Sequence, residues 1–342
     1  MADIYKAFTA DDIVAGDAQT ISQPIWSENM NPYSASAASG IGFFTSSAQL
    51  SQSGDYYMNI YHRNPQSDAN AAIQFALAYG NKDGSGSVGD ANTVGNNAND
   101  TPSRAIYSQY RNMLLPPTDS VFSFGGVDSK EIIAINIARS RFRQKVDPGN
   151  WELRLGSGST GFISSYSTFI DASGAGENPT INEAGRVFGI YSGSGGVTQS
   201  STQYGLFYPD QGVFVFHAGL LRANLGMPFN SASAVQARNH VTMSLRISGS
   251  TYFQARSEEK ITSTHFFVRV TNKQFNFSNN PTFVTGSTGT FLHSSMLRNP
   301  SVYITTIGMY DDSNQLLAVA KLSKPLLKSF NREALIKVKL DY

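Results

Sequence analysis

The sequence contains no cysteine, few charged residues and no long apolar run, and each shortage excludes a class of protein. Without cysteine the chain has no disulfide and no thiolate metal site, which fits synthesis in a reducing cytoplasm. Because no stretch of about 18 apolar residues is present, we expect no membrane-spanning helix and no membrane partner. Residues 1–16 carry neither a basic leader nor an apolar run, so we expect no signal peptide.

Charge is scarce and balanced. Charged residues make up 15% of the chain, against ~25% in typical domains. Lysine and arginine number 26 and aspartate and glutamate 25, so the basic excess with which nucleic-acid-binding modules neutralise phosphates is missing. We therefore expect no nucleic-acid partner. A surface with few charges favours contacts with other subunits.

Hydrophobic residues are plentiful, at 40% with 22 Phe and 16 Tyr, and are sufficient for a core. Their main period is two residues, which predicts β-strands with one buried face. The alternation of Val241, Met243, Leu245 and Ile247 with polar residues is the clearest example. Strands are expected at 56–63, 71–79, 130–139, 150–155, 212–217, 241–248, 265–270 and 334–341. The last of these should bury Ile336, Val338 and Leu340 and expose Lys337, Lys339 and Asp341.

One segment, 102–115, predicts a helix. Thr101 suits the N-cap, Pro102 suits the first helical position, and Pro116 and Pro117 end the segment. Its apolar stripe comprises Ile106, Tyr110, Met113 and Leu114.

The expected fold is mainly β, with antiparallel β-sandwich-like sheets, one or two short helices and long Gly/Ser-rich loops. The Gly/Ser-rich stretches are 80–99 and roughly 156–202. We expect an N-terminal β-rich domain at 1–155, a Gly/Ser-rich connecting region at 156–202, and a C-terminal β domain at 203–342. Loops as long as 80–99 are functional or disordered, or become ordered against a neighbouring subunit.

Two glycine motifs match GxGxxG, at 84–89 and 156–161. A dinucleotide site also requires a helix directly after the motif, to hold the pyrophosphate at its amino end. Neither following segment predicts a helix, and a chain with 30 glycines produces such matches by chance. We interpret both as loops and expect no cofactor.

The histidines lack metal-binding spacing. None lies three or four residues from another, and no HExxH motif is present. We expect ordinary surface or core side chains and no metal. A GxSxG nucleophile motif is also absent, which leaves a serine hydrolase of that type unsupported. The five histidines are His62, His217, His240, His265 and His293.

Adjacent carboxylates occur at Asp311-Asp312 and Glu258-Glu259. The first pair lies in a DDSN segment typical of a turn, and the second is interpreted as a solvated turn between strands. Neighbouring side chains on a strand point to opposite faces, so neither pair forms a catalytic dyad by itself. Aromatic pairs such as Phe43-Phe44 and Tyr56-Tyr57 are used in cores and interfaces more often than as stacking platforms. The sequence therefore favours a protein that is not an enzyme.

The carboxy-terminal third carries the strongest signal. The segment 303–311 reads YITTIGMYD, residues 316–321 read LLAVAK, and a DDSN turn lies between them, which predicts a β-hairpin from Tyr303–Tyr310 and Leu316–Leu322. This block, with THFFVRVTNKQFNFSNNPTF at 264–283 and NDTPSRAIYSQYR at 99–111, resembles structural proteins of contractile-tailed bacteriophages. The resemblance is to those of large marine and cyanobacterial myophages, and in the hairpin to tail-collar and fibre-attachment modules.

The resemblance implies a tail or baseplate protein of the virion that is assembled in the host cytoplasm in multiple copies, with other tail or baseplate proteins as partners. It implies no catalytic residues. Three alternatives stay open: a receptor- or glycan-binding tail fibre component, a polysaccharide-depolymerising tail enzyme, and a capsid or neck protein. Aromatic side chains clustered on an exposed face would favour the glycan binder, and two carboxylates about 5–10 Å apart in a cleft would favour the depolymerase.

Overall fold

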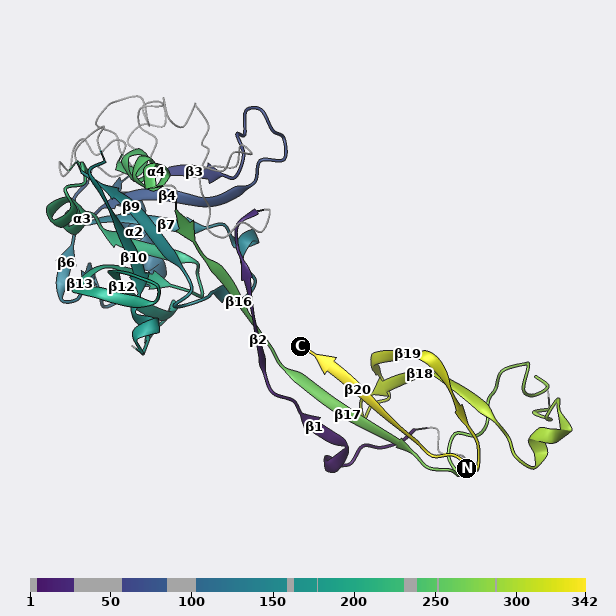
Figure 1. The fold of residues 1–342 in the computed structure, drawn as a ribbon. Helices are drawn as coiled ribbons and strands as arrows, with labels where there is room; N and C mark the ends of the chain where they lie inside the picture. Colours follow the sequence, from purple (N-terminus) through teal and green to yellow (C-terminus); the bar gives the residue numbers. More distant parts are fainter. Residues whose placement is uncertain are drawn as a thin grey trace. The chain divides into compact units, whose positions relative to one another are not determined.

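The computed structural model describes residues 5–27, 57–84, 103–158, 163–176, 178–230, 239–250, 252–286 and 288–342. The chain forms two compact units (Figure 1). Unit 1 consists of Met1–Thr20 together with Lys260–Tyr342, and unit 2 consists of Ile21–Glu259.

Unit 2 is built on one large antiparallel sheet of ten strands. The strand order is β15-β9-β10-β12-β13-β14-β7-β4-β3, and β11 pairs with β12. This architecture confirms the expectation of a mainly β, antiparallel fold. The strands are β3 (Tyr57–Tyr61), β4 (Ile73–Asn81), β7 (Glu131–Ile137), β9 (Glu152–Ser157), β10 (Ser165–Asp171), β11 (Thr180–Asn182), β12 (Gly185–Ser194), β13 (Val197–Tyr208), β14 (Val213–His217) and β15 (Phe253–Gln254).

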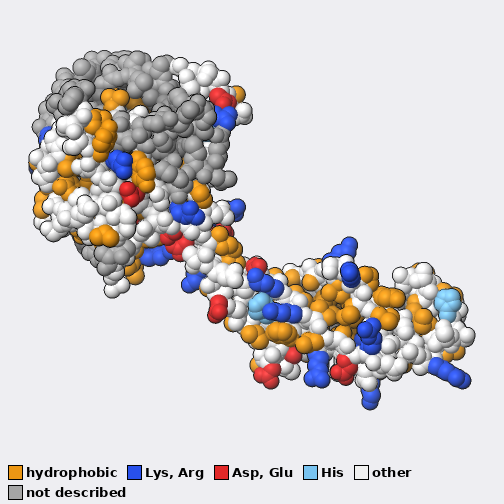
Figure 2. Space-filling model, viewed as in Figure 1, with side chains coloured by type: hydrophobic (Ala, Val, Ile, Leu, Met, Phe, Trp, Pro, Cys, Tyr) orange, Lys and Arg blue, Asp and Glu red, His pale blue; other side chains and the backbone are white. Residues whose placement is uncertain are grey.

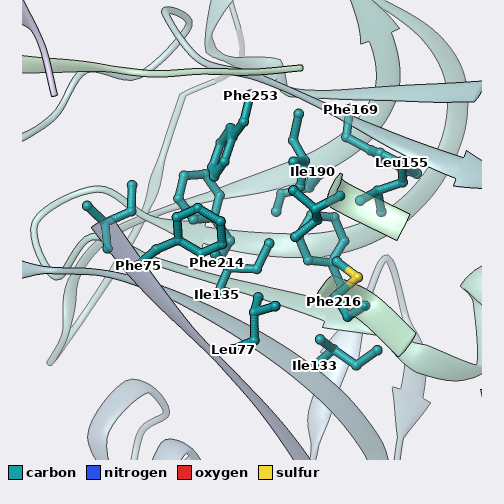
Figure 3. Close-up of a cluster of buried hydrophobic side chains, with 14 of the residues drawn as sticks. Phe75, Leu77, Ile133, Ile135, Leu155, Phe169, Ile190, Phe214, Phe216 and Phe253 are labelled. Carbon is teal, nitrogen blue, oxygen red and sulfur yellow. The ribbon is translucent and has the colours of Figure 1, made fainter. Parts of the chain in front are cut away.

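This sheet curls so that strands near its two ends face each other across the core. Phe253 lies on the edge strand β15 and Phe75 on β4, far apart in the strand order, yet their ring centroids are only 5.5 Å apart. The ring centroid of Phe214, which lies on β14 in the middle of the sheet, is 6.1 Å from that of Phe253. The core therefore fills the inside of one curled sheet (Figure 3), and the two sheet layers implied by the sandwich-like expectation are opposite parts of the same sheet.

The segment 241–248, predicted to be a strand, is instead part of helix α4 (Asn239–Ser250). Met243 and Ile247 are 0% and 1% exposed, whereas Leu245 between them is 61% exposed. A strand would place all three on one face, but a helix separates Leu245 from the other two. The helix contacts β9 towards one end of the sheet and β4 and β3 at the other, so Met243 and Ile247 complete the core.

Helix α2 (Ser103–Leu114) lies within the predicted helix 102–115; Thr101 and Pro102 fall outside the described residues. The helix packs closely on β4, where a Cβ atom added to Gly80 would lie 2.9 Å from the backbone nitrogen of Tyr107. Tyr107, absent from the predicted stripe, is 1% exposed and donates a hydrogen bond from its hydroxyl to the carbonyl oxygen of Ser129 (2.7 Å). Ile106 and Leu114 of the stripe are buried, whereas Met113 is exposed.

The remaining elements of unit 2 are short. Helix α3 follows β14 directly, which brings the described α-helices to three, one more than the upper limit expected. A two-stranded sheet pairs β5 with β6, and a small sheet has the order β2-β16-β8. Strand β2 begins two residues before the first boundary of unit 2, and β16 ends two residues after the second. Their bounds are α3 (Ala218–Leu225), β5 (Phe122–Phe124), β6 (Val127–Ser129), β2 (Gln19–Pro24), β8 (Lys145–Val146) and β16 (Arg256–Ile261), with 3-10 helices η3 (Arg139–Arg141) and η4 (Ala172–Ala175).

Unit 1 contains two small sheets in place of one large one. The first has the order β1-β17-β20, in which β17 pairs with β1 on one side and with β20 on the other. The second is the hairpin of β18 and β19. The bounds are β1 (Ile13–Ala15), β17 (Ser263–Val270), β18 (Val302–Tyr310), β19 (Leu316–Lys328) and β20 (Ala334–Asp341), with 3-10 helices η1 (Ala10–Asp12) and η5 (Ser294–Leu297).

The two units do not follow the domain boundaries 1–155, 156–202 and 203–342 expected from composition. The described parts of 156–202 are mostly strands β10, β12 and the first residues of β13, in the middle of the large sheet. Glycine and serine there are compatible with strands because the alternating apolar residues Phe169, Phe188 and Ile190 enter the core. The expected C-terminal domain, 203–342, is divided between the two units. Residues 203–259 belong to unit 2, and residues 260–342 belong to unit 1.

Candidate assembly surface

The five histidines occupy separate positions in the fold. Nδ1 of His62 accepts a hydrogen bond from the backbone nitrogen of Ala72 (3.1 Å), and His265 lies opposite Lys339 across the β17–β20 pair. His240 is buried in α4, and His293 precedes η5. Within the described ranges, no group of three or more His, Asp or Glu side chains is placed to hold a metal ion.

One serine–histidine contact lies in unit 2, and its geometry is that of a helix cap. Nδ1 of His217 is 3.1 Å from the hydroxyl of Ser129 and accepts a hydrogen bond from the backbone nitrogen of Leu220 (3.3 Å). Both side chains are at least nine-tenths buried. Burial and the charge of Arg222 lower the pKa of His217. His217 therefore remains neutral and caps the amino end of α3, and Ser129 supports it.

The pair Glu258-Glu259 lies inside strand β16, where the sequence was interpreted as a solvated turn. Glu258 forms an ion pair with Lys145, with 2.8 Å between Oε2 and Nζ. Asp311 lies in the hairpin turn. The GxGxxG segment that begins at Gly156 is followed by strand β10 where a cofactor site needs a helix; residues 159–162, and 85–89 of the other motif, lie outside the described residues.

A shallow hollow of about 320 Å³ opens on unit 2 beside α2. Its walls come from apolar side chains of β4, β7, α2 and β14 and from Ala138, and its polar lining consists of Asn136, Arg139 and Gln211. The guanidinium of Arg139 is already engaged, since it lies 4.7 Å from the ring centroid of Phe142. No carboxylate is among the described residues that line the hollow, so these residues do not supply the acid and base that glycoside hydrolysis requires.

Exposed apolar side chains gather on unit 1, although it is the smaller unit. In Figure 2 hydrophobic side chains cover much of the surface where Figure 1 places β18 and β19, with lysine and arginine beside them. Patches of this kind mark interaction sites more often than scattered single residues do. Five large side chains of the hairpin form what we call the hairpin patch: Tyr303 (66% exposed), Tyr310 (44%), Leu316 (53%), Leu317 (70%) and Val319 (59%).

The turn of the hairpin is held by one carboxylate. Oδ1 of Asp311 accepts hydrogen bonds from the backbone nitrogens of Ser313 (2.9 Å) and Gln315 (2.7 Å) and from the Ser313 hydroxyl (2.8 Å). These bonds lower the pKa of Asp311. Asn314 adopts a left-handed backbone conformation (φ 61°), which asparagine tolerates in turns. The predicted DDSN turn is thus confirmed, and it fixes the two strands that carry the patch.

The chain's first described residues reach the hairpin patch. The ring of Tyr5 packs edge-on against the ring of Tyr310, with centroids 5.2 Å apart. The ring of Tyr310 also lies over Gly308, where an added Cβ would be 2.8 Å from its Cε2 atom. Tyr310 is therefore held in place on one side while 44% of it stays exposed.

The far end of the hairpin is anchored by a buried cation. The side chain of Lys328 is fully buried, and its Nζ donates hydrogen bonds to Oδ1 of Asn276 (2.8 Å) and to the carbonyl oxygens of Asn272 (3.1 Å) and Ser329 (3.2 Å). Burial lowers the pKa of Lys328. Three oxygens around one ammonium satisfy its donors, so the hairpin is fixed at this end too.

Sequence reasoning located the hairpin but missed the exposure of its side chains. The two strands and their turn follow from alternation and turn chemistry. The expected alternation implies one covered face, yet Leu316, Leu317 and Val319 are all exposed. The sequence did contain a sign of this exposure. Leu316 and Leu317 are consecutive and point to opposite faces of the hairpin, and a two-stranded sheet has too few neighbouring elements to bury both faces.

Comparisons with protein-family models, with curated proteins and with solved structures found no match for this chain. Among the helices that the structure describes, none is long and apolar enough to cross a membrane.

Proposed function

We propose that this chain is a structural subunit of a contractile-tailed phage particle, placed in the tail or baseplate, and that it binds neighbouring subunits through the hairpin patch. Two observations support this. The hairpin sequence resembles tail-collar and fibre-attachment modules, and the same hairpin exposes five large apolar side chains.

The hairpin patch carries the proposal. A monomer that left Leu317 and Val319 70% and 59% exposed near Tyr310 would have a persistent tendency to associate. The patch is also rigid, because Asp311 fixes its turn and Lys328 its base. A rigid surface loses little conformational freedom on binding, so more of the apolar burial contributes to affinity.

A glycan-binding role is the second candidate, because exposed aromatic side chains are frequent on unit 1. Tyr303, Tyr310 and Tyr342 are 66%, 44% and 71% exposed. Against it, the ring of Tyr310 packs against Tyr5 in an edge-on contact, and three of the five side chains of the patch, Leu316, Leu317 and Val319, are aliphatic. Glycan microarray binding that is abolished by Tyr303→Ala but unaffected by Leu317→Ala would favour the glycan binder.

A reconstruction of the whole particle tests the proposal. Purified particles should contain the chain in multiple copies by quantitative mass spectrometry, and density for unit 1 should lie against a neighbouring subunit. The side chains of the hairpin patch should be covered in that interface. A chain that is missing from purified particles, or one whose hairpin patch faces solvent in the assembled tail, would contradict the proposal.

A further inference from the structure

The β18–β19 hairpin is a two-stranded sheet with two outer edges. Within the described residues no third strand pairs with it, so each edge offers a row of backbone donors and acceptors. Two-stranded sheets are marginally stable in water by themselves, and proteins usually extend or protect them.

The outer edges of unit 1 differ in charge. Strand β19 carries Lys321 and Lys324 and contains Pro325, where its pairing with β18 is interrupted. Strand β20 carries Lys337 and Lys339. Lysine and proline are the residues with which natural sheets block unwanted edge pairing. Strand β18, VYITTIGMY, has neither a charge nor a proline over its nine residues.

We propose that the free edge of β18 pairs antiparallel with β18 of a second copy of this chain, so that two hairpins form one four-stranded sheet. The inference rests on the proposed function, because it names one partner of the hairpin. A two-fold axis through the middle of β18 closes this contact after two copies.

The absence of charge on β18 makes a second copy of β18 a suitable partner for its free edge. If β20 paired with itself about Val338, Lys337 of one copy would lie opposite Lys339 of the other, and directly opposed like charges destabilise a sheet. Pairing of β18 with itself opposes only uncharged residues. With the axis at Thr306, Tyr303, which is 66% exposed, lies opposite Met309 of the second copy, an apolar residue that is 9% exposed.

Single cysteines test this contact, since the chain has none of its own. A two-fold axis places one residue opposite itself, and Cβ atoms of directly opposed residues are ~4.5–5.5 Å apart, which a small shift brings within disulfide range. Thr305→Cys, Thr306→Cys and Ile307→Cys, oxidised mildly as purified full-length proteins, should include one that forms a covalent dimer in high yield.

Two control cysteines set the background. Val319→Cys lies on β19 of the same hairpin, and in the four-stranded sheet its copies are separated by three strand spacings, roughly 14 Å. Ile181→Cys is 77% exposed on unit 2. Neither should exceed collisional crosslinking. By sedimentation the wild-type protein should have twice the 37.1 kDa mass of one chain.

If none of the three β18 cysteines crosslinks above both controls, the inference is wrong, whatever the mass in solution. The possible results distinguish failure of this inference from failure of the proposed function. A chain that enters phage particles without β18 crosslinks contradicts the inference alone. A chain that crosslinks in solution but is absent from particles supports the inference and contradicts the tail or baseplate role.

Discussion

Val338 of β20 lies directly opposite Phe266 of β17, and this pair occupies the better-covered face of the β1-β17-β20 sheet. Ile13 of β1 lies on the other side of Phe266 in the same row, and the ring of Phe8 packs 5.5 Å from it. The first strand of the chain and the last are therefore joined through one phenylalanine. The expected orientation of the terminal strand is confirmed for Ile336 and Val338, which are 8% and 9% exposed, whereas Leu340 is 37% exposed.

Val338→Asp should destabilise unit 1 strongly, since it places a carboxylate at a buried position beside Phe266. The expected cost is on the order of several kcal/mol, a large part of a typical ~5–15 kcal/mol stability. Lys337→Asp is the matched control, because Lys337 lies on the opposite face over the ring of Phe267 (5.8 Å). Thermal melting should show a large loss for the first variant and a small one for the second. Equal melting temperatures would contradict the register.

Gly80→Ala should loosen the packing of α2 on the large sheet. The new methyl group would lie 2.9 Å from the backbone nitrogen of Tyr107, so the helix has to shift. Overpacking of this kind costs about 1–3 kcal/mol. Gly286→Ala is the control, because its added Cβ meets nothing within 4 Å. Urea unfolding of both variants checks the difference, and an unchanged midpoint for Gly80→Ala would show that α2 does not approach so closely.

Protonation of His217 should weaken unit 2 in acid. The pKa of His217 is lowered from 6.5 in the folded state by burial first and by Arg222 second. The unfolded chain therefore binds the proton more readily, and the contribution of His217 to stability is present above pH 6.5 and is lost as the pH falls through the folded-state pKa. His217→Asn keeps a helix cap that does not titrate. The difference in unfolding free energy between the two proteins should shrink from pH 8 to pH 5, and a constant difference would disprove this role.

Local patterns predicted most of the strands, helix α2 and the hairpin, because each depends on spacing within a few residues. The segment 241–248 was predicted wrongly because Met243 and Ile247 fit both a two-residue and a four-residue period. The helix is favoured because it places both side chains in the core between the two ends of the curled sheet, and this tertiary contact is not visible in the local sequence. The pairing of Ile13 with Phe266 joins residues far apart in the chain, and no local pattern encodes it. The division into units depends on such pairings and was missed for the same reason.

Prediction of the hairpin patch from the sequence was limited in the same way. The turn at Asp311 follows from residue type, but the exposure of Leu317 depends on which strands are absent from the hairpin's neighbourhood. Alternation in a sequence indicates that a face is apolar. It does not indicate whether that face is buried within the chain or against another subunit.

Incorporation of patch variants into phage particles tests the central claim most directly. The double variant Leu317→Asp, Val319→Asp alters two side chains that are 70% and 59% exposed, so its melting temperature should match that of the wild type. Ile181→Asp, at a 77% exposed position on unit 2, is the matched control. Tagged copies supplied during infection should enter purified particles equally for the wild type and the control. The double variant should be reduced about tenfold or more, since each 1.4 kcal/mol of lost contact is a factor of ten. Equal incorporation of all three proteins would contradict assembly through the hairpin patch.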